Sequence, residues 1–554
     1  MQPDEIVKEI LRLRGITEEE DVREFLSEKP KLTYDSFLLP GAEEGADYLL
    51  GVLTRGESVC VYGDYDADGV CGAAMLVLFL REAARALNSE SKITYYIPSR
   101  TSEGYGLNNE ALKTIKDRGA NVVVTIDCGS VSVNEAAYAR SIGLGLVITD
   151  HHDPDNDNLP DCIHVNPKLY ARGDSGYPNK MLSGTGVAYK FCGALIRRMP
   201  EGLINPSSLS SLIDLVCVAT VADVMPLTGE NRTFVKYGLS MLRRGRRPAF
   251  RALISVSGIN PAKLDTRDIG FGLAPRINAL GRMEDASEGV EFFLTDDEER
   301  IRSIAARMNA FNQNRQRIQE EVVSDCLKLI EPAEKFLWLR PDNAHEGVAG
   351  IVAGKIREKT GLPCAVITKT LDDGEELLKG SARGAGRLDL ISLLRGHAEL
   401  FERLGGHSAA AGFSVRLENE AKLRKLLSQD LVNMLAADPG LLDNKPEAEL
   451  EIAAADVTRG LAEAIESLGP FGQGNEKPLF SITTPVEEIA GIRVIGQDSK
   501  HLRFFVGGVQ CVYFWGGKTV FPASGTVDIL GCPEINEWNG DRNIQFAVKR
   551  VDML

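Results

Sequence analysis

The chain has 554 residues, of which 44% are hydrophobic and 26% are charged, and its formal net charge is -16 at pH 7. This length exceeds what one hydrophobic core usually serves, so several domains are expected. The acidic balance excludes a protein that coats nucleic acid indiscriminately, although it leaves room for a local binding groove. Ten cysteines form no C-x-x-C pair, and the sequence contains neither a signal-like apolar start nor an apolar run of membrane-spanning length. A cytoplasmic protein with reduced thiols and no membrane span is therefore predicted.

The first half of the chain alternates between strand and helix patterns. Residues 1–57 contain two short helical segments, over 6–15 and 19–26, and carry no recognisable chemistry. From residue 58 to about 222, apolar runs typical of buried strands alternate with amphipathic helical segments. Such alternation favours a doubly wound α/β fold with a parallel sheet.

An acidic turn follows the first strand of this region. In VCVYGDYDADGVCGAAMLVLFL, residues 59–80, a buried strand and a long apolar helix flank Asp64, Asp66 and Asp68. One interpretation is an Asx-rich loop in which Asp68 caps the helix and Gly69 relieves the backbone. The other is a cation site, because three neighbouring carboxylates repel one another unless a cation neutralises them.

Later strand ends favour the cation site. Asp127 lies in NVVVTIDCG, His151 and His152 lie in LGLVITDHH, and Asp223 lies in CVATVADVMPL. Open α/β sheets place their ligands at the carboxyl ends of the strands, where these residues would meet. Oxygen ligands mixed with imidazole suit Mn²⁺ or Mg²⁺ better than a structural zinc, and four acidic strand ends are enough for two ions.

The motifs GDYDADG, DCG, DHH and VADVMP, in this order, resemble those of the DHH phosphoesterase family. Later segments resemble the RecJ single-strand-specific 5′ exonucleases within that family, over nearly the whole chain. The resemblance implies that Asp66 and Asp127 hold one ion, with Asp127 as a bridging ligand. It implies a second ion on Asp68, Asp127, His151 and Asp223, and it leaves His152 to contact the scissile phosphate as charge stabiliser or proton donor.

One position departs from the family. The pattern His-x-x-x-Asp-x-Asp falls on Tyr62, Asp66 and Asp68, so a tyrosine replaces the expected histidine. A neutral phenol is a poor metal ligand. Asp64, two residues before Asp66, is therefore predicted to complete the first ion's ligands, directly or through a water.

Two further motifs of the first half are candidate DNA contacts. IPSRTSEGYGL carries Arg100 and Tyr105, which are either ordinary loop residues or, as the resemblance implies, substrate contacts. GFGLAPRINALGRM resembles a RecJ signature, which implies that Arg276, Asn278 and Arg282 shape the floor of the nucleic-acid channel. The arginine-rich run LRRGRRPAFR, residues 242–251, is either a solvated face or a contact with the phosphate backbone.

The second half begins with a long helix. Residues 296–330 lack proline and glycine, so an uninterrupted helix bridging two domains is predicted before Pro332. The following segments resemble the DHH-associated domain. The resemblance implies that Ser381 and Arg383 in LLKGSAR and His407 in ERLGGHSAAAGF grip the substrate phosphates, whereas the alternatives are a surface ion pair and a structural histidine.

The last hundred residues consist of evenly spaced short strands, which suggest a small barrel. Their order resembles the oligonucleotide-binding (OB) barrel of RecJ proteins, introduced by SLGPFGQGN. Aromatic side chains of this region either stack on bases or fill the barrel core, with one or two stacking residues expected: Phe504, Tyr513, Phe514, Trp515 and Trp538.

The predicted architecture is thus an α/β doubly wound DHH domain joined by a long helix to a smaller α/β DHH-associated domain, followed by a β-barrel of the OB type. The predicted boundaries are 1–57 for an amino-terminal helical segment, 58–295 for the DHH domain, 296–331 for the connecting helix, 332–445 for the DHH-associated domain and 446–554 for the barrel.

The resemblance implies a processive 5′ to 3′ exonuclease that uses two ions, Mn²⁺ or Mg²⁺, to release mononucleotides from single-stranded DNA during recombination and repair. Implied partners are a single-strand-binding protein and a RecQ-type helicase, and a monomer is expected. One alternative is a phosphodiesterase for oligonucleotides or cyclic dinucleotides, which a barrel after the DHH-associated domain disfavours. Another is an inactive nucleic-acid-binding scaffold, which the intact acidic motifs disfavour.

Overall fold

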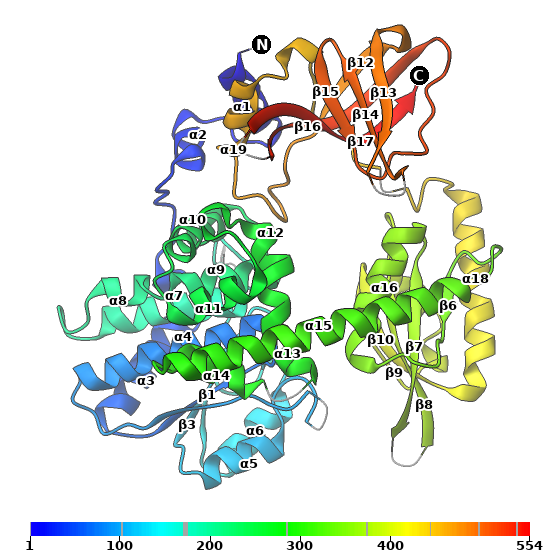
Figure 1. The fold of residues 1–554 in the computed structure, drawn as a ribbon. Helices are drawn as coiled ribbons and strands as arrows, with labels where there is room; N and C mark the ends of the chain where they lie inside the picture. Colours follow the sequence, from blue (N-terminus) through cyan, green and yellow to red (C-terminus); the bar gives the residue numbers. More distant parts are fainter. Residues whose placement is uncertain are drawn as a thin grey trace. The chain divides into compact units, whose positions relative to one another are not determined.

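The computed structural model describes residues 2–100, 103–169, 176–283, 286–372, 375–443, 445–496, 499–538 and 541–554. The chain forms two compact units (Figure 1). The first unit comprises residues 1–309 together with 447–554, and the second comprises residues 310–446. Among the described residues, no helix combines the length and apolar character needed to cross a membrane.

The first unit is built on a five-stranded parallel sheet. The strand order is β2-β1-β3-β4-β5, and the strands are β1 (Val59–Gly63), β2 (Ile93–Tyr96), β3 (Val122–Ile126), β4 (Gly145–Thr149) and β5 (Ile163–Val165). Every residue of β1 and β3 is buried, as expected for strands covered on both faces. The predicted doubly wound parallel sheet is confirmed. The neighbouring strands β1 and β3 form the topological switch point, because the sheet extends from β1 to β2 on one side and from β3 to β4 on the other. A ligand crevice is therefore expected at the carboxyl ends of β1 and β3.

Helices cover both faces of this sheet (Figure 1). One face is covered by α3 (Ala42–Thr54), α4 (Ala67–Ala86) and α7 (Gly184–Arg198), and the other by α5 (Asn109–Asp117) and α6 (Val133–Ser141). Helix α4 is almost entirely buried because it lies between the sheet, α7 and the helices that follow. Its amino end is therefore fixed in position beside the acidic turn.

A group of helices follows the sheet. It comprises α8 (Pro206–Ser210), α9 (Ile213–Ala222), α10 (Gly229–Arg243), α11 (Pro248–Ser257), η2 (Pro261–Lys263), α12 (Thr266–Asp268), η3 (Ile269–Leu273), α13 (Ala274–Met283) and α14 (Ser287–Leu294). The short helix η1 (Ser36–Leu38) precedes the sheet and packs against α7. Helix α9 packs against α4, and Asp223 forms its carboxyl cap, so the predicted fourth strand end is instead the end of a helix. This packing brings the fourth acidic motif to the amino end of α4.

The carboxyl-terminal part of the first unit is a seven-stranded sheet of order β11-β12-β16-β17-β15-β14-β13, coiled around its own core. Its elements are β11 (Leu450–Glu451), η6 (Ala454–Asp456), α19 (Arg459–Glu466), β12 (Phe480–Pro485), η7 (Val486–Glu488), β13 (Ile489–Ile495), β14 (His501–Val506), β15 (Val509–Tyr513), β16 (Thr526–Trp538) and β17 (Asp541–Met553). We call this part the barrel domain.

The amino-terminal helices α1 (Pro3–Leu13) and α2 (Glu19–Leu26) belong with the barrel domain. Ile6, Ile10 and Leu11 of α1 lie in one core cluster with Phe480 and Phe504 of the barrel. The sequence pattern predicts residues 1–57 as a separate amino-terminal segment. The structure instead completes the barrel core with the first helix of the chain, so neither part can be removed without exposing apolar surface.

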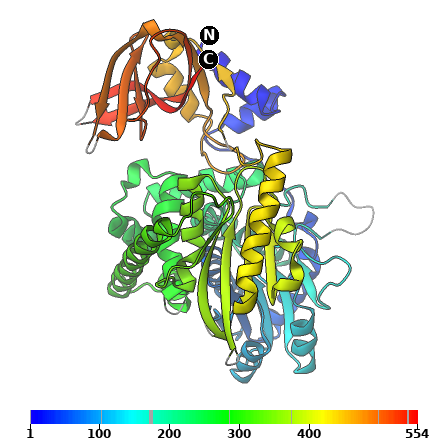
Figure 2. The same cartoon turned by 90° about the vertical axis from the view of Figure 1, so that its right-hand side faces the viewer.

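The second unit is a five-stranded mixed sheet of order β6-β7-β8-β10-β9 with helices on both faces. Helix α15 (Glu298–Lys328) enters it from the first unit, as predicted for the long helix. The other elements are β6 (Leu337–Leu339), α16 (Glu346–Thr360), β7 (Cys364–Asp372), β8 (Glu375–Arg383), α17 (Leu390–Arg395), η4 (Ala398–Leu400), β9 (Arg403–His407), β10 (Ala410–Arg416), η5 (Leu417–Asn419) and α18 (Glu420–Ala437). Figure 2 shows α18, in yellow, lying along one face of this sheet.

Candidate metal centre and nucleic-acid contacts

The acidic turn is held by backbone hydrogen bonds from its own helix. Asp66, not the predicted Asp68, caps α4: its Oδ1 accepts from the backbone N–H groups of Asp68 at 2.9 Å and Gly69 at 3.0 Å. The helix begins at Ala67, which puts Asp68 inside the first turn. Gly69 is required here because a Cβ would lie 2.3 Å from the carbonyl oxygen of Asp64.

Asp68 is anchored by a second helix. The backbone N–H groups of Gly184 and Thr185, at the start of α7, donate to its two carboxylate oxygens at 2.7 and 2.8 Å. These contacts stabilise the carboxylate and leave each oxygen a further lone pair for a cation. A Cβ on Gly184 would lie 2.6 Å from the Cβ of Asp127, so only glycine lets α7 approach this closely.

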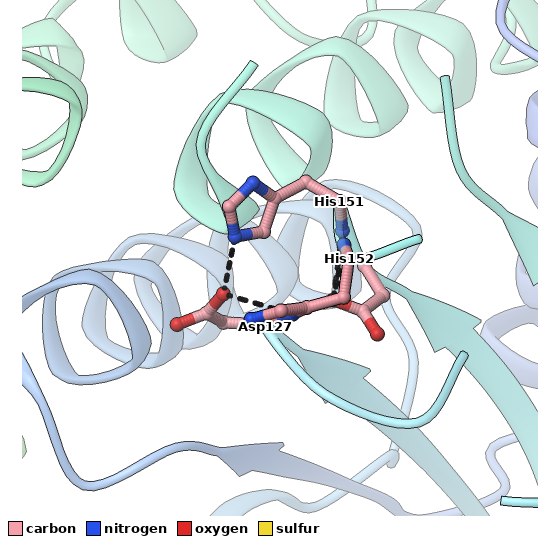
Figure 3. A group of neighbouring side chains, drawn as sticks. Asp127, His151 and His152 are labelled. Atoms are coloured by element: carbon pink, nitrogen blue, oxygen red, sulfur yellow. Dashed lines mark hydrogen bonds and ion pairs between the residues drawn. The ribbon is translucent and has the colours of Figure 1, made fainter. Parts of the chain in front are cut away.

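Asp127, His151 and Asp223 meet at the carboxyl ends of β3 and β4. Asp127 adopts a left-handed conformation, with φ +64°, directly after β3. The Nε2 atom of His151 lies 3.0 Å from Oδ1 of Asp127 (Figure 3) and 3.4 Å from Oδ2 of Asp223. Burial lowers the pKa of His151, which favours a neutral ring able to bind a cation.

These residues fit two cations. The ligand atoms of Asp64, Asp66 and Asp127 all lie within 4.8 Å of one another, and those of Asp68, His151 and Asp223 do so as well. Four buried atoms of this centre form no hydrogen bond: Asp64 Oδ1, Asp127 Oδ1, His151 Nε2 and Asp223 Oδ2, although His151 Nε2 lies within ion-pair distance of two of the others. Buried polar atoms normally form hydrogen bonds, so four that form none and lie in one small region indicate a cation site. Their oxygen and imidazole chemistry suits Mn²⁺ or Mg²⁺.

The carboxylates are also electrostatically destabilised in the absence of a cation. Burial and the neighbouring Asp66 charge raise the pKa of Asp64 from 3.8 to about 8. Burial and the charges of Asp68 and Asp66 raise the pKa of Asp223 to about 8. Burial and the same two charges raise the pKa of Asp127 well above its ordinary value. Protons therefore compete with cations for this centre at neutral pH.

A pH-dependent effect of metal on stability is expected from these shifts. In the metal-free protein the raised carboxyls hold protons that the unfolded chain has released, so stability falls as the pH rises from about 4 towards 8. Mn²⁺ should therefore raise the unfolding temperature more at about pH 8 than at about pH 6. Thermal unfolding of metal-free and Mn²⁺-loaded protein at both pH values measures the difference. Equal increases in unfolding temperature at the two pH values would contradict the assignment of these carboxylates as metal ligands.

Asp150 positions His152 rather than binding metal, although it lies near Asp127, His151 and His152. Its oxygens accept from the backbone N–H groups of Ser130 at 2.9 Å and His151 at 2.7 Å, and one of them lies 2.8 Å from Nδ1 of His152. Burial opposes the charged form of Asp150, but the hydrogen bond with His152 and its charge outweigh burial and lower the pKa of Asp150. Burial likewise opposes a charged His152, and the Asp150 contact outweighs it and raises the pKa of His152.

Sequence reasoning missed the support beneath His152. The Nδ2 atom of Asn166 donates to the carbonyl oxygen of His152 and to Oγ of Ser130, both at 2.9 Å. Asn166 follows β5, which has only three residues and was not identified from the sequence. The available signal in the sequence is a polar residue directly after the short IHV segment, in which two apolar residues flank His164.

Tyr62 lies outside the metal centre. Its hydroxyl donates to the carbonyl oxygen of Gly106 at 2.8 Å, and its ring stacks on Tyr96 with 5.7 Å between centroids. Burial raises the pKa of Tyr62 far above its ordinary value, so the phenol stays protonated. Tyr62 therefore packs within the sheet and is not a ligand candidate. Asp64, in place of the missing histidine, adds a third carboxylate to those of Asp66 and Asp127.

The predicted DNA contacts of the first unit differ in how closely they approach the residues of the metal centre. The hydroxyl of Tyr105, a residue that is 55% exposed, lies 3.3 Å from His152, and the Arg100 guanidinium lies 5.1 Å from the ring centroid of Tyr65. The Oδ1 atom of Asn278 accepts from the backbone N–H of Ala67 at 2.6 Å, so this side chain supports the acidic turn.

Of the two arginines in the GFGLAPRINALGRM motif, the structure describes the side chain of Arg276 but not that of Arg282. Arg276 donates to Asn309 at 3.0 Å and to the carbonyl oxygen of Gly272 at 2.6 Å, and it is only partly buried. The side chain of Arg282 lies outside the described residues. Phe271, one turn before Arg276, was not singled out from the sequence and is 79% exposed.

The arginine-rich run at residues 242–251 has mainly structural contacts. Arg247 forms two hydrogen bonds with Asp214, at 2.8 and 2.9 Å, and Arg243 donates to the carbonyl oxygen of Leu264 at 2.8 Å. Arg251 donates to the carbonyl oxygen of Gly245. These donors hold neighbouring helices and loops together, which favours the structural interpretation over a phosphate-backbone contact.

In the second unit, Ser381 and Arg383 lie on β8 and share one face of the strand. A Cβ built on Gly350 of α16 would lie 2.9 Å from Oγ of Ser381 and 3.0 Å from a guanidinium nitrogen of Arg383, so both side chains border the same glycine. Burial lowers the pKa of Arg383. His407 is exposed at the end of β9, and its Nδ1 accepts from the backbone N–H of Ala409.

The aromatic residues of the barrel domain separate into core and surface. Phe504 is buried in the core, whereas Phe514 and Trp515 are 53% and 75% exposed. The backbone N–H of Trp515 donates to Nδ1 of His501 at 3.0 Å, and Lys500 lies 5.8 Å from the Trp515 ring centroid. Tyr513 is partly buried against the core, and the side chain of Trp538 lies outside the described residues.

Three sequence families match successive parts of the chain. Residues 58–220 match the amino-terminal domain of the DHH family, residues 333–433 match the DHHA1 domain, and residues 448–550 match the RecJ OB domain. The chain is 32% identical to the single-stranded-DNA-specific exonuclease RecJ of Bacillus subtilis, over 98% of this chain and 67% of the relative. It is 33% identical to the Escherichia coli protein of the same name, over 93% of this chain and 90% of the relative.

Solved structures agree with these matches. The crystal structure of RecJ in complex with Mn²⁺ from Thermus thermophilus covers 100% of this chain and 76% of that protein, with a TM-score of 0.79 at 28% identity. The corresponding Mg²⁺ complex has a TM-score of 0.73. An exonuclease RecJ bound to manganese has a TM-score of 0.59 at 30% identity, over 71% of this chain and 95% of that protein.

Proposed function

Because the chain belongs to the RecJ family of single-stranded-DNA-specific exonucleases, we propose that it is a Mn²⁺- or Mg²⁺-dependent exonuclease that degrades single-stranded DNA from the 5′ end to mononucleotides. The observation that carries this proposal is the cluster of four buried ligand atoms without a hydrogen bond, three at the carboxyl ends of parallel strands and one on Asp223 at the end of α9. Asp66, Asp68, Asp127, His151 and Asp223 are all retained, which favours an active enzyme over a binding scaffold although Tyr62 replaces the first motif's histidine. The barrel domain favours a polymeric substrate over a cyclic dinucleotide.

The proposed ligand sets follow the two groups of donor atoms. Asp64, Asp66 and Asp127 would hold one ion, and Asp68, His151 and Asp223 would hold the other, with Asp127 near both groups. When bound, the ions would supply an activated water and offset the charge that builds on the phosphoryl oxygens. Asp66 and Asp68 are kept in place by the amide groups of α4 and α7, so the ligands are pre-organised before the substrate arrives.

His152 acts on the substrate rather than on the ions. Its side chain is 47% exposed, whereas that of His151 is 8% exposed. Asp150 holds the ring through Nδ1 and raises the pKa of His152, which favours the charged form with Nε2 available to the scissile phosphate as a hydrogen-bond donor. Tyr105, next to His152, is placed to contact the terminal nucleotide.

Digestion of end-labelled oligonucleotides tests this function. Single and double strands labelled at the 5′ or 3′ end are incubated with Mn²⁺, with Mg²⁺ or with a chelator. Mononucleotide release from the 5′ end of single strands, abolished by the chelator, is the expected result. Release from the 3′ end, or hydrolysis of cyclic dinucleotides alone, would overturn the proposal.

Ser381 and Arg383 are proposed to bind the terminal 5′-phosphate, since they border one glycine and offer a hydroxyl and a guanidinium. Replacing Arg383 with alanine should erase the preference for a 5′-phosphorylated end over a 5′-hydroxyl end. Initial rates on the two substrates measure the preference. Arg387→Ala, which removes an exposed arginine paired with Asp438, is the control and should leave the preference intact. A preference retained in Arg383→Ala would place the phosphate contact elsewhere.

Trp515 is proposed to stack on a base of the bound strand, because a large exposed ring offers a face to any base. Trp515→Ala should weaken binding of a long single strand by about tenfold, while cleavage of very short strands is unchanged. Titration of a fluorescent oligonucleotide measures the affinity. Val520→Ala, which also removes an exposed apolar side chain of the barrel domain, should have no effect. This substitution is cleaner than deleting the barrel, whose core includes α1.

The cellular setting rests on family membership. We propose that the enzyme acts as a monomer in the cytoplasm during recombination and repair, where a RecQ-type helicase and a single-strand-binding protein supply its substrate. All ten cysteines are free thiols, as expected in a reducing compartment.

A further inference from the structure

A glycine-rich loop of the barrel domain touches the segment that follows the ligand candidate Asp223. This loop, residues 469–475, is called the barrel loop here. The backbone N–H of Leu227 donates to the carbonyl oxygen of Gln473 at 2.8 Å. A Cβ on Gly472 would lie 2.7 Å from Cδ1 of Leu227, and a Cβ on Gly474 would lie 3.1 Å from Cβ of Pro226. Leu227 is buried by this contact.

The contacted segment contains a strained residue next to Asp223. Val224 has a φ of +55°, a region that β-branched residues rarely adopt, although its side chain is 63% exposed. Such a conformation persists only where the surroundings impose it. The backbone N–H of Met225 donates to Thr220 at 3.0 Å, and the side chain of Asn231 donates to the carbonyl oxygen of Pro226 at 3.0 Å. The hydrogen bond from Leu227 to Gln473 is the contact by which the barrel domain holds this segment in place.

The barrel loop is itself firmly held. The Nδ2 atom of Asn475, a buried residue, donates to the carbonyl oxygens of Leu468 at 2.9 Å and Pro470 at 2.8 Å. Its Oδ1 accepts from Arg14 at 2.7 Å, and Arg232 donates to the carbonyl oxygen of Gly469 at 2.7 Å. The loop is therefore a rigid surface rather than a mobile connection.

We propose that the barrel loop is a positioning element of the metal centre. By fixing residues 224–227 it holds the strained turn after Asp223, and thereby keeps the Asp223 carboxylate beside His151 and Asp68. The barrel domain then contributes to the affinity of one ion in addition to binding DNA. This inference rests on the two-ion site of the proposed function, and it concerns positioning residues that do not touch the substrate.

Substitutions on the two sides of this contact test the proposal in the full-length protein. Gly472→Ala places a methyl group against Leu227, and Leu227→Ala removes the side chain from the other side. Gly460→Ala in α19 is the matched control, because its new Cβ would meet only ordinary contacts at 3.5 Å or more. Calorimetric titration of metal-free protein with Mn²⁺ measures each site, and thermal unfolding reports any general loss of stability.

Each single substitution should weaken one of the two Mn²⁺ sites by about tenfold or more, the effect typical of residues that support metal ligands. The other site and the affinity for a long single strand should not change. The double variant should bind Mn²⁺ more tightly than either single variant, because the added methyl fills the space that Leu227 vacates. Gly460→Ala should match the wild type in both measurements.

Two results would overturn the inference. One is a Mn²⁺ isotherm for Gly472→Ala and Leu227→Ala that superimposes on the wild-type curve. The other is a lower unfolding temperature with unchanged Mn²⁺ binding, which would make the contact ordinary domain packing. Wild-type protein that binds two Mn²⁺ ions but does not hydrolyse DNA would refute the proposed function alone. An active wild type with unaltered variants would refute the positioning role alone.

Discussion

Replacing Asp127 with asparagine is expected to lower the rate of DNA hydrolysis by about a thousandfold or more, because the residue serves both proposed ions. Its carboxylate lies with Asp64 and Asp66 on one side and approaches His151 on the other. Asparagine keeps the size of the side chain and tolerates the left-handed backbone at this position, so a folding defect is not expected. Single-turnover rates at saturating Mn²⁺ measure the loss.

Binding of single-stranded DNA by Asp127→Asn should stay close to that of the wild type, since the phosphate contacts are distributed over other parts of the chain. The control is Asp117→Asn, which removes an exposed carboxylate paired with Lys113 on α5 and should retain full activity. Calorimetry should also find weaker Mn²⁺ binding at both sites of Asp127→Asn. An active variant, or one that loses only a single ion, would refute the bridging role.

Replacing His152 with alanine is expected to lower kcat by about 100- to 1000-fold while Mn²⁺ binding is unchanged. The ring lies outside the two ligand groups assigned to the ions, and its raised pKa favours the charged form, which can donate to the phosphate. Steady-state rates together with Mn²⁺ calorimetry separate this effect from a loss of metal. A parallel loss of Mn²⁺ affinity would instead make His152 a ligand.

The pH profile distinguishes the charge of His152 from its position. Asp150 raises the pKa of His152 through the hydrogen bond at Nδ1, so Asp150→Asn should let the ring lose its proton at lower pH. The alkaline decline of kcat should therefore shift to lower pH in Asp150→Asn. An unchanged decline would assign it to another group.

The sequence by itself determined the strands of the catalytic sheet and the residues at their ends. Strands β1 and β3 consist mainly of apolar residues, and Asp64 and Asp127 follow them directly, so local pattern and the geometry of parallel sheets place both carboxylates at one edge. The long helix α15 and the presence of strands in the barrel domain were equally predictable, because periodicity and breaker residues act over a few neighbouring positions. The strands β16 and β17, with 13 residues each, are longer than the short strands that the sequence predicts.

Only the tertiary structure decided which groups hold these carboxylates. Gly184, which donates to Asp68, is 116 residues away in the chain, and Asn278, which accepts from Ala67, is 211 residues away. The hydroxyl of Tyr62 turned to Gly106 instead of the ions, and α1 joined the barrel core, although its amphipathic pattern predicted only that one face would be buried. Hydrophobic periodicity specifies that a side chain is buried or that a strand ends. The partner of a buried polar atom depends on long-range packing, which local sequence patterns do not contain.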